Sequence, residues 1–112
     1  MAISLDQKDE ILVFKITGNL DSFTANDLKK KFEDVFINFN NFVFDLSNMN
    51  NINSTGLGGI INCLKKCMDF KKNAIISGVK KDNEILFKIS KIHNIVSIVD
   101  TVEDAILDLK KS

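Results

Sequence analysis

The chain has 112 residues, of which 45% are hydrophobic, and it contains neither proline nor tryptophan. This length is typical of one domain, which buries about 65% of the surface that the unfolded chain exposes. The 15 basic residues, all of them lysine, balance 15 acidic residues, so the formal net charge is zero. This balance and the lack of arginine argue against binding to nucleic acid or anionic lipid through overall charge.

The N-terminal segment, the lengths of the apolar runs and the cysteines argue against a secreted, membrane-spanning, disulfide-bonded or metal-binding protein. Residues 1–6 lack a basic region followed by an apolar run, so they do not resemble a signal peptide. The longest apolar runs are far shorter than the roughly 20 residues that span a bilayer, and we expect a cytoplasmic protein without membrane contact. Cys63 and Cys67 are spaced poorly for a disulfide, and the single histidine, His93, is distant in sequence. We expect two buried or half-buried thiols, no metal site and no cofactor.

Apolar runs and amphipathic segments alternate along the chain. Runs of β-branched and aromatic residues predict strands at 2–5, 11–17, 41–46, 74–77 and 95–99, with a hairpin turn at 7–9. Apolar residues at helical spacing predict helices at 24–36, 54–68, 83–92 and 101–111. A polar loop is expected at 47–53. This order predicts a single α/β domain over residues 1–112, with a mainly parallel mixed sheet, one antiparallel N-terminal strand and about four helices.

In two of the predicted helices, the spacing of apolar residues indicates which side chains face the core. These faces consist of Leu57, Ile60, Ile61, Leu64 and Met68 in the second helix and of Ile85, Leu86, Ile89 and Ile92 in the third. The first helix is expected to be capped by Asp21, Ser22 or Thr24. Phe23, beside Asp21, is a candidate for an exposed anchor at an interface.

The segment 50–60, Asn-Asn-Ile-Asn-Ser-Thr-Gly-Leu-Gly-Gly-Ile, is the most informative part of the sequence. It leads from a buried strand into a helix, with Ser54 at the expected N-cap. Glycine inside a helix costs about 1 kcal/mol relative to alanine, so Gly58 and Gly59 together cost about 2 kcal/mol. We expect Gly59 to allow close packing of the helix on the sheet. Gly56 and Gly58 are expected on the exposed side, where the backbone of another protein can approach.

Three catalytic or nucleotide-binding motifs fail at this segment. A dinucleotide fingerprint needs a third glycine where Ile61 stands, and the expected loop is too long for its tight turn. A phosphate-binding P-loop lacks its spacing and its lysine. A nucleophile elbow would need glycine at Ile52, two residues before Ser54. We therefore expect a protein that is not an enzyme, with a hydroxyl beside a helix N-terminus, where a phosphate is well tolerated.

Two motifs resemble those of STAS-domain anti-sigma factor antagonists. Gly18-Asn19-Leu20-Asp21 resembles the G-x-[LI]-D segment of that family. Phe44-Asp45-Leu46-Ser47, followed by residues 52–58 (Ile-Asn-Ser-Thr-Gly-Leu-Gly), resembles its D-L-S…[IM]-D-S-[ST]-G-L-G signature. The resemblance extends over nearly the whole chain and implies a STAS domain.

The resemblance implies a switch in a bacterial signalling pathway. Such a protein binds an anti-sigma factor, itself a GHKL-type serine kinase, and so releases a sigma factor. Phosphorylation of Ser54 is implied to end the binding, and a PP2C-type phosphatase to restore it. The implied partner-binding residues are Asp21, Asn53, Ser54, Thr55, Gly56 and Gly58. Asn53 replaces the signature aspartate, which predicts slow or poor phosphorylation.

Two other interpretations of the sequence are an interaction or scaffold module of the same fold and a regulatory domain that binds a nucleotide or small anion.

Overall fold

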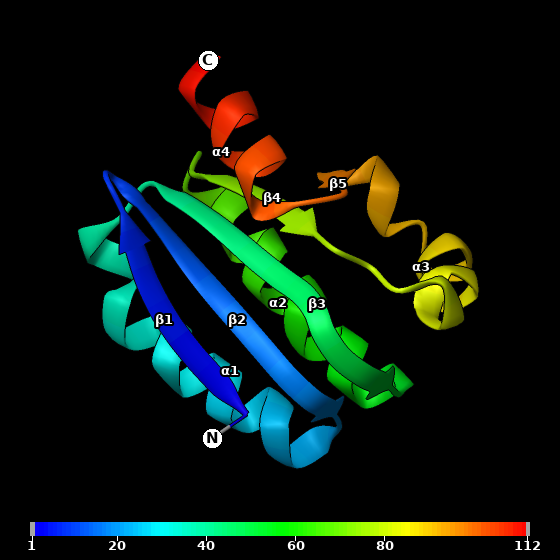
Figure 1. Cartoon of the computed structure of the whole chain (residues 1–112). Coiled ribbons are helices and arrows are strands. Elements are labelled where there is room, and N and C mark those ends of the chain that lie inside the picture. The colour runs from blue at the N-terminus through cyan, green and yellow to red at the C-terminus, as the bar shows by residue number, and fades with distance from the viewer. Residues whose placement is uncertain (1, 112) are drawn as a thin grey trace.

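Strands and helices alternate along the chain in the order that the hydrophobic pattern predicts. The computed structural model describes residues 2–111 (Figure 1). The strands are β1 (Ile3–Lys8), β2 (Ile11–Leu20), β3 (Asn41–Ile52), β4 (Asn73–Ser77) and β5 (Ser97–Val99). The α-helices are α1 (Ser22–Val35), α2 (Ser54–Asp69), α3 (Glu84–Ser90) and α4 (Val102–Lys111), and the 3-10 helices are η1 (Phe36–Asn38), η2 (Lys81–Asn83) and η3 (Ile92–Asn94).

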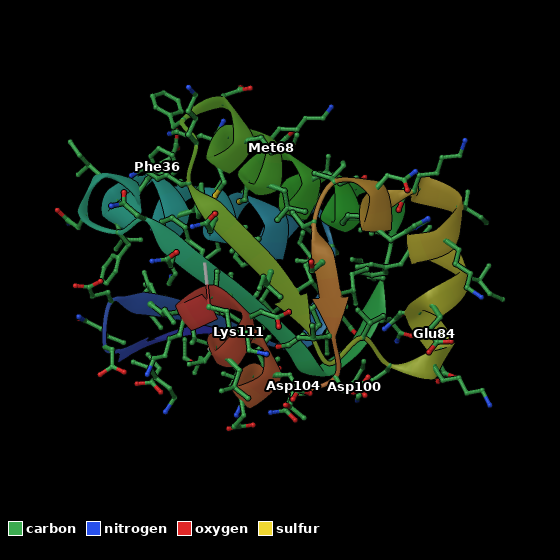
Figure 2. The ribbon with its side chains drawn as sticks, turned by 90° about the horizontal axis from the view of Figure 1, so that it is seen from above. Phe36, Met68, Glu84, Asp100, Asp104 and Lys111 are labelled. Atoms are coloured by element: carbon green, nitrogen blue, oxygen red, sulfur yellow. The ribbon has the colours of Figure 1, made fainter. Side chains whose placement is uncertain are left out.

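The five strands form one sheet in the order β1-β2-β3-β4-β5. β1 is antiparallel to β2, and the other neighbours are parallel. Because each crossover advances by one strand in the same direction, right-handed connections place α1, α2 and α3 on the same face. α4 follows the last strand and covers the opposite face (Figure 2), where Asp104 and Lys111 lie across the sheet from Phe36 and Met68. This arrangement confirms the predicted fold class.

β2 contributes side chains to the cores on both faces of the sheet. Leu12, Phe14 and Ile16 face the larger core under α1 and α2, whereas Ile11 and Val13 face the smaller core under α4. Burial on both faces explains the uninterrupted apolar run in this part of the sequence. The centre of the larger core is a cluster of phenylalanine rings, in which the Phe14 and Phe44 rings stack with centroids 5.4 Å apart.

The predicted polar loop at 47–53 is instead mostly strand. β2 also runs beyond its predicted end, through Gly18 to Leu20, and β3 pairs with it as far as Ile52. β4 has already ended at Ser77, so β2 and β3 continue as a two-stranded ribbon beyond the rest of the sheet. Backbone pairing holds this ribbon, while its polar side chains face solvent and only Met49 of the β3 extension is buried. The hydrophobic pattern detects strands by their buried side chains. It therefore did not predict this extension of β3, which is stabilised by backbone hydrogen bonds.

The third predicted helix is shorter than expected and is rotated about its axis. It ends at Ser90, and Lys91 adopts a left-handed conformation with φ of 58°. Phe87 faces the core instead, which turns Ile85 and Ile89 outward to 71% and 72% exposure. Met68, also predicted to be buried, is 55% exposed on the last turn of α2.

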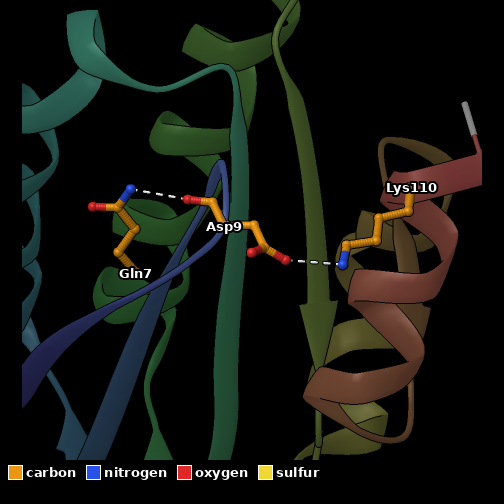
Figure 3. Close-up of polar contacts among 3 residues, drawn as sticks. All are labelled: Gln7, Asp9 and Lys110. Carbon is orange, nitrogen blue, oxygen red and sulfur yellow. Dashed lines mark hydrogen bonds and ion pairs between the residues drawn. The ribbon is translucent and has the colours of Figure 1, made fainter.

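The hairpin turn is tighter than predicted and lies against α4. β1 extends to Lys8 and pairs with Ile11, which leaves only Asp9 and Glu10 in the turn. Lys110 Nζ of α4 donates to Asp9 Oδ2 at 2.9 Å, and the Gln7 side chain donates to the Asp9 carbonyl at 2.9 Å (Figure 3). Because the ion pair is exposed, it contributes little to stability.

The end of β2 determines where α2 begins. The backbone N–H of Asn53 donates to the carbonyl oxygen of Leu20 at 3.2 Å. A Cβ atom on Gly56 would lie 2.1 Å from the same carbonyl oxygen, a clash that only glycine avoids. The first turn of α2 therefore rests directly on the backbone of β2.

Replacing Gly56 by alanine should lower the free energy of unfolding by about 3 kcal/mol, the upper range for overpacking, because backbone must shift. Gly58→Ala is the matched control, since a Cβ at Gly58 has nothing within 4 Å. That change should raise the free energy of unfolding by about 1 kcal/mol, because alanine forms helix better. Urea unfolding followed by circular dichroism measures both, and equal effects would contradict the described contact.

Candidate functional site

A single residue connects β3 to α2. Asn53 is the N-cap of α2, and its side-chain oxygen accepts a hydrogen bond from the backbone N–H of Gly56 at 2.8 Å. The prediction that Ser54 is the cap was therefore wrong, as was the expectation of a long loop before the helix. Asn53 lies one residue earlier and has an amide oxygen that reaches the third residue of the helix.

Ser54 and Thr55 are the first two residues of α2, and both are exposed. Backbone N–H groups in the first turn of a helix have no intrahelical acceptor and carry part of the positive end of the helix dipole. The Ser54 hydroxyl is thus accessible to a second protein and lies in a region of the helix that favours negative charge.

Asp21 begins α1 at the same end of the molecule. Its side chain accepts from the backbone N–H of Thr24 at 3.1 Å, and Thr24 Oγ1 donates to the Asn19 carbonyl at 3.1 Å. The hydrogen bond from the Thr24 backbone holds the pKa of Asp21 below its ordinary value. Pairing of Leu20 with Ile52 brings Asp21 and Asn53, the caps of α1 and α2, to the ends of neighbouring strands.

The three glycines of α2 have different surroundings. Gly56 is buried against Leu20, so the expectation that it lies on the exposed side was wrong. Gly59 faces α1, where its Cβ would lie 2.8 Å from the Cβ of Ala25, so it permits close helix–helix packing and not the predicted helix–sheet packing. Gly58, expected on the exposed side, is half-buried, and a Cβ there would meet nothing within 4 Å.

A groove of about 510 Å³ runs between α1 and α2 and begins beside Thr55. We call it the α1–α2 groove. It is lined by Ser22, Ala25, Asn26, Lys29, Phe32 and Glu33 of α1 and by Thr55, Gly58, Gly59, Asn62, Cys63 and Lys66 of α2. This groove was not predicted from the sequence. Its signal was the spacing of small and polar residues at positions 55, 58, 59 and 62, which share one helix face.

Other groups carry little reactive chemistry. Burial raises the pKa of the Cys63 thiol to about 12 and that of Cys67 to about 11, so both are protonated at neutral pH. Both are buried free thiols, as predicted.

Within residues 2–111, no three His, Cys, Asp or Glu side chains group as metal ligands. Across the same residues, no helix has the length and apolar character needed to cross a membrane. Phe23 is 82% exposed, and its role as an interface anchor stays a prediction.

Replacing Asn53 by alanine should lower the free energy of unfolding by about 1 kcal/mol, because the N–H of Gly56 loses its acceptor. Asn53→Asp is the control, since a carboxylate keeps the hydrogen bond and suits a helix N-terminus. Its stability at pH 7 should equal or exceed that of the wild type. Chemical denaturation of the three proteins tests this role, which an unchanged Asn53→Ala protein would contradict.

Comparison with solved structures shows the same fold in several proteins. TM1081, a candidate anti-sigma factor antagonist from Thermotoga maritima, matches 96% of this chain and 94% of its own with a TM-score of 0.90 and 22% identity. An anti-sigma factor antagonist from Mycobacterium paratuberculosis matches 96% of this chain and 92% of its own, with a TM-score of 0.87 and 17% identity. The antagonist SpoIIAA in its unphosphorylated form matches 99% of both chains, with a TM-score of 0.76 and 14% identity.

The family model of the STAS domain matches residues 2–105, nearly the whole length of the chain. Together with the five-stranded mixed sheet and the junction at Asn53, this match shows that the chain belongs to the STAS domain family.

Proposed function

We propose that this protein is an anti-sigma factor antagonist that acts in the cytoplasm as a binding protein and not as an enzyme. Its partner is an anti-sigma factor that is also a GHKL-type serine kinase, and binding releases a sigma factor. Phosphorylation of Ser54 ends the binding, and a PP2C-type phosphatase restores it. The observation that carries the proposal is the exposed Ser54 hydroxyl at the first position of α2 in a STAS domain.

The surroundings of Ser54 suit a protein contact. Asp21, Asn53 and Thr55 lie where the β2–β3 ribbon meets the first turns of α1 and α2, and Gly58 follows in the second turn of α2. Gly56 is buried beneath this surface. Its close approach to the Leu20 carbonyl positions the first turn of α2 against β2. Among the structural relatives, SpoIIAA is known in a phosphorylated form, with a TM-score of 0.77 and 16% identity, which makes phosphorylation a natural mode of control to test here.

A phosphate on Ser54 would act locally. It adds about −1.5 to −2 charge at a helix N-terminus, where the dipole and free N–H groups accommodate it, so the fold is retained. At the centre of a protein interface the same dianion must lose water, which is costly unless the partner supplies a cation. The carboxylate of Asp21 adds negative charge on the neighbouring helix end. Phosphorylation therefore favours dissociation without unfolding.

Asn53 affects how readily Ser54 is phosphorylated in the proposed switch. Its side-chain oxygen caps α2, and an aspartate in its place would cap equally well while presenting a second, charged oxygen. Such an oxygen is suited to orient the acceptor hydroxyl or a metal held by the kinase. We therefore retain slow phosphorylation as part of the proposal.

Incubation with the GHKL-type anti-sigma kinase of the same organism and ATP should add one phosphate to the wild type, located at Ser54 by fragment-ion mass spectrometry. Ser54→Ala should abolish labelling, whereas Thr55→Ala, the neighbouring hydroxyl, should retain it. Labelling that persists in Ser54→Ala and disappears in Thr55→Ala would move the acceptor to Thr55.

Ser54→Asp should weaken kinase binding well over tenfold, more than about 1.4 kcal/mol, because a fixed negative charge replaces the hydroxyl at the contact. Ser97→Asp is a control that adds the same charge at an exposed residue at the start of β5. Ser97 is level with Val43 in the sheet, far from the end of β3 that Ser54 follows, and the variant should bind like the wild type. Titration calorimetry measures both affinities. Equal affinities for Ser54→Asp and the wild type would contradict the proposed electrostatic switch.

A further inference from the structure

Packing within the chain does not explain Gly58. The other two glycines of α2 avoid clashes with Leu20 and Ala25, but a Cβ at Gly58 would meet nothing within 4 Å. An alanine there would fit the space and favour the helix, since glycine is the poorer helix former. The residue thus leaves a hollow that the chain itself does not fill.

The hollow opens into the α1–α2 groove. Ala25 and Gly59 form a shallow apolar floor beside it, and Phe32 and Cys63 continue this floor toward the far end. The groove is about 510 Å³, enough for a large side chain and parts of its neighbours. It starts at Thr55, so it is continuous with the surface around Ser54 that the proposed function uses.

The charges of the groove favour an acidic occupant. Within residues 2–111, the lysines that form ion pairs with carboxylates are Lys8, Lys31 and Lys110. Lys29, in the middle of the groove wall, is therefore an exposed cation without a carboxylate partner. The other charged residues of the lining are Lys66 and Glu33, so two cations and one anion give the groove a net charge of +1. Lys66 Nζ lies over the Phe36 ring, 4.6 Å from its centroid, which leaves Lys29 as the lysine of this lining that can meet a partner.

We propose that the α1–α2 groove receives a segment of the anti-sigma kinase that places one large apolar side chain over Gly58 and a carboxylate beside Lys29. This inference rests on the proposed function and extends its contact surface from Ser54 along both helices. The apolar side chain gains burial in the hollow, and the carboxylate gains a partner at the rim of the interface, where charge pairing directs docking.

Filling the hollow tests the first half of the proposal. Gly58→Leu should keep or raise the thermal midpoint and yet weaken binding to the kinase at least tenfold. Lys65→Leu, which places the same side chain at an exposed position of α2 outside the groove, should leave the affinity within about twofold of the wild type. A folded Gly58→Leu protein that binds like the wild type would overturn the groove as the binding site.

Charge reversal tests the second half. Lys29→Glu should weaken binding at least tenfold at low salt, and the loss should shrink as salt screens the interaction. Lys30→Glu makes the same change in net charge at the next residue, which is exposed but does not line the groove, and should have a several-fold smaller effect. Equal losses for the two variants would show that overall charge governs binding and would overturn the specific carboxylate contact.

The Ser54 experiments separate the two proposals. If the kinase labels Ser54 and Ser54→Asp weakens binding while Gly58→Leu and Lys29→Glu do not, the proposed function stands and the groove inference is wrong. If the wild type neither binds the kinase nor is labelled by it, both are overturned.

Discussion

The structure depends on a close contact between the first turn of α2 and the last residue of β2. Two features of the chain act on one carbonyl group, that of Leu20. The Asn53 N–H donates to it, and Gly56 approaches it without a side chain. With the Asn53 cap, these interactions fix the direction in which α2 leaves the sheet, and Ser54 lies between the two anchoring residues. The exposed hydroxyl is therefore held by backbone geometry, which a side-chain modification leaves intact.

The proposed switch and the stability of the domain occupy different parts of the molecule. The phenylalanine cluster and the core under α4 lie at the centre of the sheet, whereas Ser54, Asp21 and Gly58 lie on its surface near one end. α1 and α2 run parallel and begin at that same end, so the positive ends of their dipoles lie side by side. Asp21 offsets one of them with a full charge. Asn53 caps the other with a neutral amide, which leaves that end better suited to a new anion.

The fold was predictable because the pattern of apolar residues shows which side chains are buried. The predictions were wrong where something other than side-chain burial determines the structure. Phe14, Phe44 and Ile60 follow the periodicity of their elements closely, so the order of elements along the chain and the two large helices were predictable. The β3 extension is held by its backbone, α3 is reoriented by Phe87, and the turn at Asp9 depends on local backbone geometry. None of these appears in hydrophobic spacing.

The candidate site was partly predictable for a similar reason. Its glycines stood out from the sequence because they contradict helix propensity, and Ser54 stood out because it begins the helix within a motif that resembles the family signature. The assignment of each glycine to a neighbour was not predictable, since Leu20 and Ala25 are brought to α2 only by the tertiary fold. The α1–α2 groove likewise needs both helices in place, because each helix alone shows only a row of small and polar residues.

The β2–β3 ribbon that projects beyond β4 has a consequence for how such a domain diversifies. Its strands are joined by main-chain hydrogen bonds, which are indifferent to the side chains they carry, and Met49 and Leu20 are its principal buried members. Most positions on the ribbon can therefore change identity at small thermodynamic cost. Duplicated copies of the domain can therefore acquire different binding specificities on the ribbon, each for its own partner, while the hydrophobic core stays the same.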